Sequence, residues 1–541
     1  MAAELQFRFS RHQSPCIKDR AGLCCASPDR NEGNLAENNL AARFLNSCNK
    51  NGSRIAICDS SRNFTYKQIQ NLALNFASHL LHENDFQVGD HVGLRLPNSA
   101  EYVVAFYGCI LAGAIVVPLP MYEERDRINR LADLADVKYL YTNQPDPSSV
   151  YSSLRFSDDE NSLCNESDRG GNQLAMLMFT SGTTGTSKAV MISHQNLISN
   201  AESIGKYLPI CSDDRALAAM PFCHAFGNSV LQTHLLNGAC LVTGQESAFV
   251  ADIVRVIREF ECTSFSAIPE IVESMLTVEF DADLQQQLRY LAVAGGAMDP
   301  ARAIRLQQRI RPTELYVMYG QTEATARLAY IPPTKLRLAS NSIGQAIPGV
   351  ELEVRTDCGQ RTGVEAPGIL YAKGDNIMLG YWRDDVATQK IIQDGWLCTG
   401  DLAMVRPDGL IQLCGRSSEL VKIQGYRFHP VEVEQRVMQA IPGVRATATD
   451  FEFYGKTRLA LFVIPDSGND STEQKIRSVC RQILPSHMVP QRFKVLENWP
   501  LNSAGKVDRI ALRNSLLDKK GFSSHRSSLG CPNEIVESKD E

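Results

Sequence analysis

The sequence predicts an α/β protein built on parallel sheets, followed by a smaller α+β region. Over residues 36–412, short apolar runs typical of strands alternate with helix-patterned runs, which is the order expected of βαβ units. From 417 to 517 the pattern changes to short strands and two helical runs. The chain has 541 residues, of which 44% are hydrophobic and 21% charged, a globular composition with room for several domains.

Both ends of the chain are polar. Residues 1–35 are rich in Asn, Arg and Ser, which predicts a flexible segment, and 518–541 predict a disordered tail. The chain start lacks the apolar run of a secretory signal. The predicted organisation is a large N-terminal core at 36–415 and a smaller C-terminal domain at 416–517, with a surface loop or linker at 145–172.

Local patterns predict individual elements. HVGLRLP at 91–97 reads as a strand and PVEVEQRVMQA at 430–440 as a helix. Residues 102–122 carry no charge and are numerous enough to cross a bilayer, but glycines and prolines divide them. We therefore predict a buried helix near 103–112, a buried strand at 115–120 and no transmembrane segment.

The charge balance argues against nucleic acid or an anionic membrane as a partner. Lys and Arg total 55 and Asp and Glu 61, which gives a net charge of -6. Small molecules or other proteins are the expected partners. The 16 cysteines form no C-x-x-C pair and are scattered, often inside apolar runs, which is typical of a reducing cytosol and predicts a cytoplasmic protein.

A loop of glycines and small hydroxyl residues follows the apolar run LAMLMF. Its sequence from Met178 to Lys188 is MFTSGTTGTSK. Glycines let backbone N–H groups approach anionic oxygens, hydroxyls add donors, and the lysine adds a mobile positive charge. The sequence therefore predicts a phosphate-binding loop, although its G-x-x-G-x-x-K spacing differs from that of the Walker loop.

Four further segments follow the loop. They are PFCHAFG at 221–227, YGQTEAT at 319–325, WLCTGD at 396–401 with Gly415, Arg416 and Lys422 downstream, and PLNSAGKVDR at 500–509. In this order, the five segments resemble the adenylate-forming superfamily, which includes acyl-CoA and aryl-CoA synthetases, luciferases and the adenylation domains of peptide synthetases. The resemblance covers residues 40 to 515, approximately the whole chain between its polar ends.

The resemblance implies a large N-terminal domain of stacked α/β subdomains with a small barrel, followed by a small mobile α+β lid. It also implies an AMP-forming acid–thiol ligase. Such an enzyme joins a carboxylate to the α-phosphate of ATP, releases pyrophosphate and passes the acyl group to a thiol. The implied ligands are ATP, Mg²⁺ and either CoA or the phosphopantetheine of a carrier protein. Positive charge must be supplied where the two anions meet.

The resemblance assigns catalytic roles to four residues. Lys506 is expected to bridge the substrate carboxylate and the α-phosphate, and Lys188 to bind phosphate. His224 is expected at the mouth of the acid pocket, where it positions the carboxylate. Glu323, with Thr184, is the expected metal site, because Mg²⁺ prefers carboxylate and phosphate oxygens.

Other residues are assigned to the nucleotide or the thiol. Asp401 is expected to accept both ribose hydroxyls, Arg416 to bind ribose or phosphate, Tyr319 to stack on adenine or line the acid pocket, and Gly425 to line the thiol channel. The full set is Thr180, Ser181, Gly182, Thr183, Thr184, Gly185, Gly295, Gly296, Ala297, Tyr319, Gly320, Gln321, Thr322, Asp401, Arg416, Lys422 and Gly425.

Phe226, Val230 and Ala294 are expected to line the acid pocket. Residues 224–229 include no acidic side chain that could pair with an α-ammonium, so a plain carboxylic acid, aliphatic or aromatic, is favoured over an amino acid. For His224, a core histidine held by hydrogen bonds is the alternative. A zinc site is not expected, because His224 and its neighbour His234 lack a matching ligand pair.

Three positions depart from the superfamily pattern. Ser418 stands at the expected hinge, Ser187 replaces the usual proline and Ala189 the usual glycine. Three functions stay open. An acyl-CoA synthetase leads, because no segment of the kind that blocks CoA in fatty-acyl-AMP ligases precedes the C-terminal domain. An acyl-AMP ligase that loads a carrier protein is the alternative, and a catalytically silent nucleotide-binding scaffold is the most remote.

Overall fold

The computed structural model divides the chain into two compact units, residues 1–419 and residues 420–541 apart from 503–506. The structure describes residues 6–11, 38–59, 62–83, 85–143, 151–155, 169–180, 187–244, 250–339, 342–356, 358–416, 421–423, 426–453, 456–466, 472–501 and 507–516. The two units are described separately below.

The first sheet of the N-terminal unit has eight strands. Their order is β19 (Gly380–Tyr381), β9 (Ala189–Ser193), β8 (Leu174–Phe179), β5 (Ile115–Pro118), β4 (His91–Arg95), β6 (Tyr139–Thr142), β1 (Gln6–Arg11) and β7 (Tyr151–Arg155). The central strands β8, β5, β4 and β6 are parallel, as the strand–helix alternation predicts. Strands β1 and β7 pair with each other, although β1 lies in the segment predicted to be flexible and β7 in the segment predicted to be a surface loop or linker.

The second sheet has nine strands. Their order is β16 (Gln345–Ala346), β15 (Ala329–Ile331), β14 (Glu314–Tyr319), β13 (Tyr290–Val293), β12 (Ser264–Ala267), β10 (Arg215–Leu217), β11 (Cys240–Thr243), β2 (Ile55–Asp59) and β3 (Arg62–Thr65). The six strands from β14 to β2 are parallel, and β15, β16 and β3 add antiparallel edges.

A layer of helices packs against both sheets. It comprises α1 (Leu40–Asn51), α2 (Tyr66–Leu81), α3 (Ala100–Leu111), α5 (His194–Tyr207) and α6 (Ala225–Leu236). The largest hydrophobic cluster joins these helices to strands of both sheets. In α3 every residue except Glu101 is buried, and Ser99 caps its first turn, so the uncharged stretch forms the predicted buried helix and leads into β5. No helix of the described residues is long and apolar enough to span a membrane.

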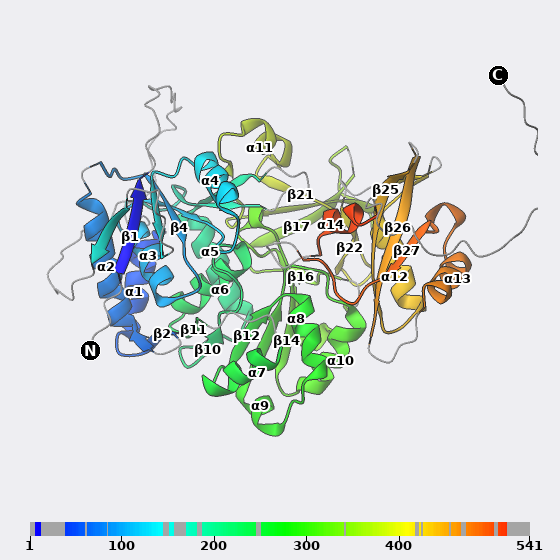
Figure 1. Ribbon diagram of the computed structural model, residues 1–541, viewed down its shortest axis with the longest axis horizontal. Helices are drawn as coiled ribbons and strands as arrows, with labels where there is room; N and C mark the ends of the chain where they lie inside the picture. The colour runs from blue at the N-terminus through cyan, green and yellow to red at the C-terminus, as the bar shows by residue number, and fades with distance from the viewer. Residues whose placement is uncertain are drawn as a thin grey trace, which may run out of the picture. The chain divides into compact units, whose positions relative to one another are not determined.

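Other helices cover the outer faces. Helix α4 (Arg125–Leu134) packs on the first sheet. Helices α7 (Val250–Glu259), α8 (Pro269–Ser274), α9 (Ala282–Gln287) and α10 (Pro300–Ile310) gather beside β12 and β14 of the second sheet (Figure 1).

The third sheet lies in the part of the chain where the resemblance implies a small barrel. It is antiparallel, with the order β17 (Val350–Arg355), β18 (Pro367–Gly374), β21 (Trp396–Val405) and β20 (Ile392–Gln393), and β22 (Ile411–Arg416) pairs with β21. Helix α11 (Asp385–Ile391) leads into β20. Burial alternates along β21, so Leu397, Thr399 and Asp401 share its buried face.

The C-terminal unit is a small α+β domain. Strands β25 (Val444–Phe453), β26 (Lys456–Pro465) and β27 (Arg492–Val495) form a sheet, and β23 (Val421–Ile423) pairs with β24 (Tyr426–Phe428). Its helices are α12 (Pro430–Ala440), α13 (Glu473–Ile483) and α14 (Arg509–Asn514). Helix α12 has the predicted bounds, and its apolar side packs on β25 and β26 in one cluster.

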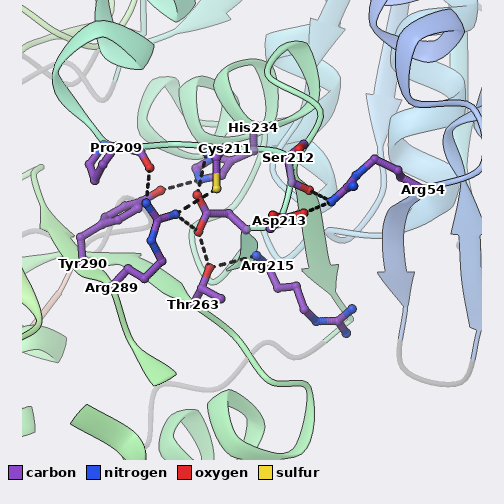
Figure 2. A network of polar contacts seen from close by, with 11 residues as sticks. Arg54, Pro209, Cys211, Ser212, Asp213, Arg215, His234, Thr263, Arg289 and Tyr290 are labelled. Carbon is purple, nitrogen blue, oxygen red and sulfur yellow. Dashed lines mark hydrogen bonds and ion pairs between the residues drawn. The ribbon is translucent and has the colours of Figure 1, made fainter. Parts of the chain in front are cut away.

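A polar network holds the amino ends of three neighbouring strands of the second sheet. Thr263 donates a 2.6 Å hydrogen bond to Asp214, which Arg289 also pairs, and these three residues directly precede β12, β10 and β13. Arg289 also reaches the Pro209 carbonyl at 2.7 Å (Figure 2). Burial opposes ionisation of Asp214, but the hydrogen bonds outweigh it and lower the pKa of this carboxyl. The network lies at the amino ends of these strands, whereas open α/β sheets bind their ligands at the opposite, carboxyl ends.

Candidate active site

Several predicted site residues follow the carboxyl ends of strands. Thr180 comes directly after β8, and its N–H donates to the Lys188 carbonyl at 3.0 Å, which closes the base of the phosphate loop. Ala294 and Gly295 follow β13, and Gly320 follows β14. Carboxyl ends of parallel strands are where open α/β sheets bind their ligands.

Lys188 and Glu323 meet at one tyrosine that the sequence analysis did not single out. The Tyr381 hydroxyl donates a 2.8 Å hydrogen bond to Glu323 Oε1, and Lys188 Nζ lies 4.4 Å from the centre of the Tyr381 ring. Burial raises the pKa of Tyr381, and the negative charge of Glu323 adds to the shift, so the phenol stays a donor. A cation and a carboxylate from distant segments are thus held on one rigid ring.

Asp401 is the second charged centre, and it is 5% exposed. Arg416 Nε lies 3.0 Å from Asp401 Oδ1, and the Tyr319 hydroxyl donates to Oδ2. The alternation of β21 buries Asp401, and the antiparallel register sets Arg416 of β22 directly opposite. Because a carboxylate has about four lone-pair sites, these two contacts leave room for further hydrogen bonds.

The loop after β14 is tightly clamped. A Cβ on Gly320 would lie 1.9 Å from the Ala326 carbonyl oxygen, so only glycine fits at this close approach. Asn376 donates to the Ala324 carbonyl at 3.1 Å and to the Arg327 carbonyl at 2.7 Å. Glu323 lies in the short 3-10 helix Thr322–Ala324, whose ends this clamp fixes.

The residues expected to line the acid pocket gather around α6. His224 is the half-buried residue before the helix, and a Cβ on Gly227 would meet the Pro221 carbonyl at 2.1 Å, so this turn is compact. A Cβ on Gly295 would lie 3.9 Å from Phe226 Cδ1. Phe226 packs with Ala294 in one apolar cluster. Val230 is buried on the next turn of the helix but belongs to the central core cluster.

The remaining predicted residues have a range of exposures. Gln321 and Thr322 are half-buried beside Glu323, whereas Gly296 and Ala297 are exposed. Lys422 is exposed on β23 of the C-terminal unit. Seven of the predicted site residues and the hinge residue lie outside the described residues, namely Ser181, Gly182, Thr183, Thr184, Gly185, Gly425 and Lys506, with Ser418 at the hinge.

Three residues that sequence reasoning missed support the site. Tyr381 joins Lys188 to Glu323, Asn376 clamps the loop, and Arg327 lies over the Phe226 ring with 4.3 Å between the guanidinium carbon and the ring centre. Tyr381 and Asn376 flank a short apolar run without periodicity, and no local pattern marks them. Arg327 carried a signal, because it is a cation two residues before the apolar strand β15.

His234, the histidine considered and rejected as a zinc ligand, is a core residue. Its two ring nitrogens lie 2.8 Å from the Val230 carbonyl and 3.0 Å from the Tyr290 hydroxyl, and Figure 2 shows the latter contact. Burial lowers its pKa. Within the described ranges, no group of three or more His, Cys, Asp or Glu side chains could hold a metal ion.

The comparison with known families identifies the class of enzyme. The sequence model of a family described as AMP-binding enzyme matches residues 44–382, more than half of the chain. The chain belongs to this family of AMP-binding enzymes. It is an AMP-forming acid–thiol ligase, which makes an acyl-adenylate from a carboxylic acid and ATP and passes the acyl group to a thiol.

Several relatives match along almost their full length. A long-chain-fatty-acid–CoA ligase of Escherichia coli O6:H1 is 26% identical, with 91% of this chain and 96% of the relative covered. The 3-[(3aS,4S,7aS)-7a-methyl-1,5-dioxo-octahydro-1H-inden-4-yl]propanoyl:CoA ligase of Rhodococcus jostii is 28% identical, with 85% and 96% covered.

Solved structures share the fold. ATP-bound MatB from Rhodopseudomonas palustris has a TM-score of 0.77 at 22% identity, and the match covers 89% of this chain and 99% of MatB. O-succinylbenzoate coenzyme A synthetase from Bacillus subtilis in complex with AMP has a TM-score of 0.74 at 23% identity, with 91% and 99% covered. The expected architecture of stacked α/β sheets followed by a small α+β domain is confirmed.

Proposed function

We propose that the protein is an acyl-CoA synthetase whose acid substrate carries no α-amino group. The observation that carries this proposal is the pair of charged centres in the N-terminal unit, Lys188 with Glu323 on the Tyr381 ring and Asp401 with Arg416. CoA is supported as the thiol by the names of the full-length relatives, several of which are CoA ligases.

The Asp401 centre is proposed to hold the ribose of ATP. Arg416 and Tyr319 fix the orientation of the carboxylate, and its remaining lone pairs can accept both ribose hydroxyls. Gly295 has a φ of 94° and its Cβ position meets only Ile268 and Phe226, so the backbone after β13 offers a close approach to the adenine.

The Lys188 centre is proposed to hold the phosphates. Lys188 supplies positive charge beside the loop base at Thr180, and Glu323 supplies one carboxylate. A single carboxylate with phosphate oxygens and water suits Mg²⁺ better than a closed protein cage does. When bound there, Mg²⁺ supplies charge neutralisation at the phosphates, with Glu323 and Thr184 as its protein ligands.

The carboxylate of the acid must approach an anionic phosphate, so positive charge is required at that point. We propose that Lys506 supplies it and that His224, at the start of α6, positions the acid. Lys506 follows from the motif resemblance alone. The buried thiols Cys48, Cys109 and Cys262, whose pKa values burial raises, support a reducing compartment such as the cytoplasm.

Pyrophosphate exchange with a panel of carboxylic acids, in the absence of thiol, tests this function. We expect exchange with at least one acid, and a drop in exchange of roughly 100-fold or more in Glu323→Gln and Lys506→Ala, the size typical for loss of a preorganised charge. Absence of exchange with every acid would support the silent scaffold instead.

Adding CoA then separates the thiol acceptors. Thioester formation with free CoA supports the synthetase. If the acyl group leaves the adenylate only when a phosphopantetheinylated carrier protein is present, the chain is an acyl-AMP ligase and the CoA assignment is wrong.

A further inference from the structure

Arg327 is a buried cation without a carboxylate partner in the described part of the chain. Its exposed fraction is 3%. Its described contacts are the Ala326 carbonyl, the Phe226 ring and Tyr207, and its Nε has no partner. Buried charges are normally paired, because an uncompensated charge in the interior is costly. Arg302, which is 9% exposed, follows that rule and lies 3.0 Å from Glu273.

Tyr207 does not neutralise Arg327. Burial raises the pKa of Tyr207 to about 12, and the nearby guanidinium only partly offsets this shift. The phenol is therefore uncharged at neutral pH. Its hydroxyl, which lies near Arg327, donates a 3.2 Å hydrogen bond to Met318 Sδ, a weak acceptor. Burial lowers the pKa of Arg327 itself, but an arginine stays protonated in proteins, so the positive charge remains.

The backbone holds this cation in place. Thr325 and Ala326, which directly precede Arg327, have φ values of 49° and 95°, a region that residues other than glycine rarely adopt. The Thr325 hydroxyl donates to the Asn376 carbonyl at 2.8 Å, and the Asn376 amide donates to the Arg327 carbonyl. Local strain of this kind persists where the surroundings fix a functional conformation.

Arg327 lies against the proposed acid pocket. Its guanidinium carbon is 4.3 Å from the centre of the Phe226 ring, and Phe226 packs in one cluster with Ala294 and Tyr207. The same loop carries Glu323, four residues earlier in the chain. A fixed cation and a phenol hydroxyl therefore lie beside the apolar wall.

We propose that Arg327 binds a second carboxylate on the acid substrate, so that the enzyme activates dicarboxylic acids at one end while Arg327 and Tyr207 hold the other. This inference rests on the proposed function and narrows its substrate class. Arg327 would be a specificity-determining residue. A guanidinium offers parallel N–H donors to a carboxylate, and this pairing supplies the missing counter-charge.

Pyrophosphate exchange with chain-matched pairs of acids tests the proposal. Each pair consists of a straight-chain monocarboxylic acid and the dicarboxylic acid with the same number of carbons, over a series of lengths. For wild type we expect kcat/KM to be at least about 10-fold higher for the best diacid than for its partner. Arg327→Met should lower this preference by about 100-fold, as expected when a site loses a charged hydrogen-bond partner. Tyr207→Phe should lower it by less.

Arg302→Met is the matched control, because it also removes a buried arginine but leaves Arg327 in place. We expect it to lower the thermal stability without changing the mono- to dicarboxylic acid ratio. The shift in melting temperature caused by AMP verifies that each variant keeps the nucleotide site. If Arg327→Met does not fold, the proposal is tested by the ratio of kcat/KM for diacid and monocarboxylic acid in wild type and by the change of this ratio in Tyr207→Phe.

The outcomes separate this inference from the proposed function. Exchange in wild type with monocarboxylic acids in preference to every diacid overturns the inference and leaves the synthetase intact. An equal loss for both members of each pair in Arg327→Met also overturns it, because that pattern means a structural role. Absence of exchange with all acids overturns the proposed function.

Discussion

At the scale of single residues, the Tyr381 hydroxyl is the contact whose role can be isolated most cleanly. Tyr381→Phe removes the 2.8 Å hydrogen bond to Glu323 and keeps the ring that faces Lys188. Hydrogen bonds to charged groups contribute about 1.5–3 kcal/mol, so we expect kcat/KM for pyrophosphate exchange to fall roughly 10- to 100-fold. Tyr141→Phe, which removes a 3.3 Å tyrosine–glutamate bond to Glu101 outside the site, should leave activity unchanged. Equal activity in both variants would contradict the assigned role of Tyr381.

Asp401 permits a second test at this scale. Asp401→Asn removes the negative charge that Arg416 pairs and halves the acceptor capacity offered to the ribose. We expect the KM for ATP to rise by about 10- to 100-fold, with a smaller change in the KM for the acid. The control is Asp408→Asn, because Asp408 forms a 2.7 Å pair with Arg406 on the surface after β21. A change in acid KM alone would argue against a ribose site.

The predictability of the site differs from residue to residue. Lys188, Glu323 and Asp401 were accessible from the sequence, because each belongs to a run of neighbours whose combined types are unusual. Tyr381 and Asn376 were not, since their roles come from pairing between distant segments. Nothing in the local sequence around Tyr381 tells that it faces both Lys188 and Glu323.

At the scale of elements, the turn after β14 depends on one glycine. In Gly320→Ala the new methyl group would lie 1.9 Å from the Ala326 carbonyl, which is backbone and cannot rotate away. Overpacking of this kind typically costs about 1–3 kcal/mol, so we expect a lower melting temperature and loss of exchange activity. Gly363→Ala is the control, because no atom lies within 4 Å of its Cβ position and its φ is not positive. A fully active, stable Gly320→Ala would show that the loop position is not required.

Elements were predictable where apolar runs were long or periodic. The uncharged run around Val103 gave α3 and β5, and the apolar run before the phosphate loop gave β8. Strands β1 and β7 were missed because they lie within segments of loop-like composition, β7 at the edge of the sheet and β1 next to it. Such strands are stabilised by pairing with neighbours rather than by their own pattern.

At the scale of the whole molecule, two buried groups give opposing pH dependences. Burial, with the charge of Arg169, lowers the pKa of His194 from 6.5 to about 4, so its contribution to stability is complete above pH 6.5 and is lost as the pH falls toward 4. This loss amounts to about 3 kcal/mol. Burial raises the pKa of Glu101 from 4.5 to about 7, so its contribution is complete below pH 4.5 and is lost as the pH rises toward 7.

The two slopes therefore partly cancel between pH 4.5 and 6.5. In Glu101→Gln the contribution of Glu101 is removed and that of His194 is no longer offset. We therefore expect the free energy of unfolding to fall more steeply with acidification than in wild type. Denaturant unfolding at a series of pH values measures this slope. His82→Gln, a change at an exposed histidine, should leave the profile as in wild type. An unchanged slope in Glu101→Gln would mean that Glu101 is ionised in the folded protein at pH 5.

The division of the chain was visible only in outline. The pattern changes near residue 417, beside the boundary between the units at 419 and 420. The strand order within each sheet was not predictable, because it depends on contacts between segments far apart in the sequence. The domain bounds of 36–415 and 416–517 stay predictions.

The polar network of Figure 2 has a practical consequence for engineering. Asp214, Thr263 and Arg289 secure the amino ends of β10, β12 and β13, whereas the acid pocket is proposed at the opposite ends of β13 and β14. Residues that stabilise the sheet and residues proposed to select the acid substrate therefore lie at opposite ends of its strands. A mutant library aimed at new substrates should randomise the rim near Phe226 and leave the Asp214 rim untouched, since the latter preserves the reserve of stability that such substitutions consume.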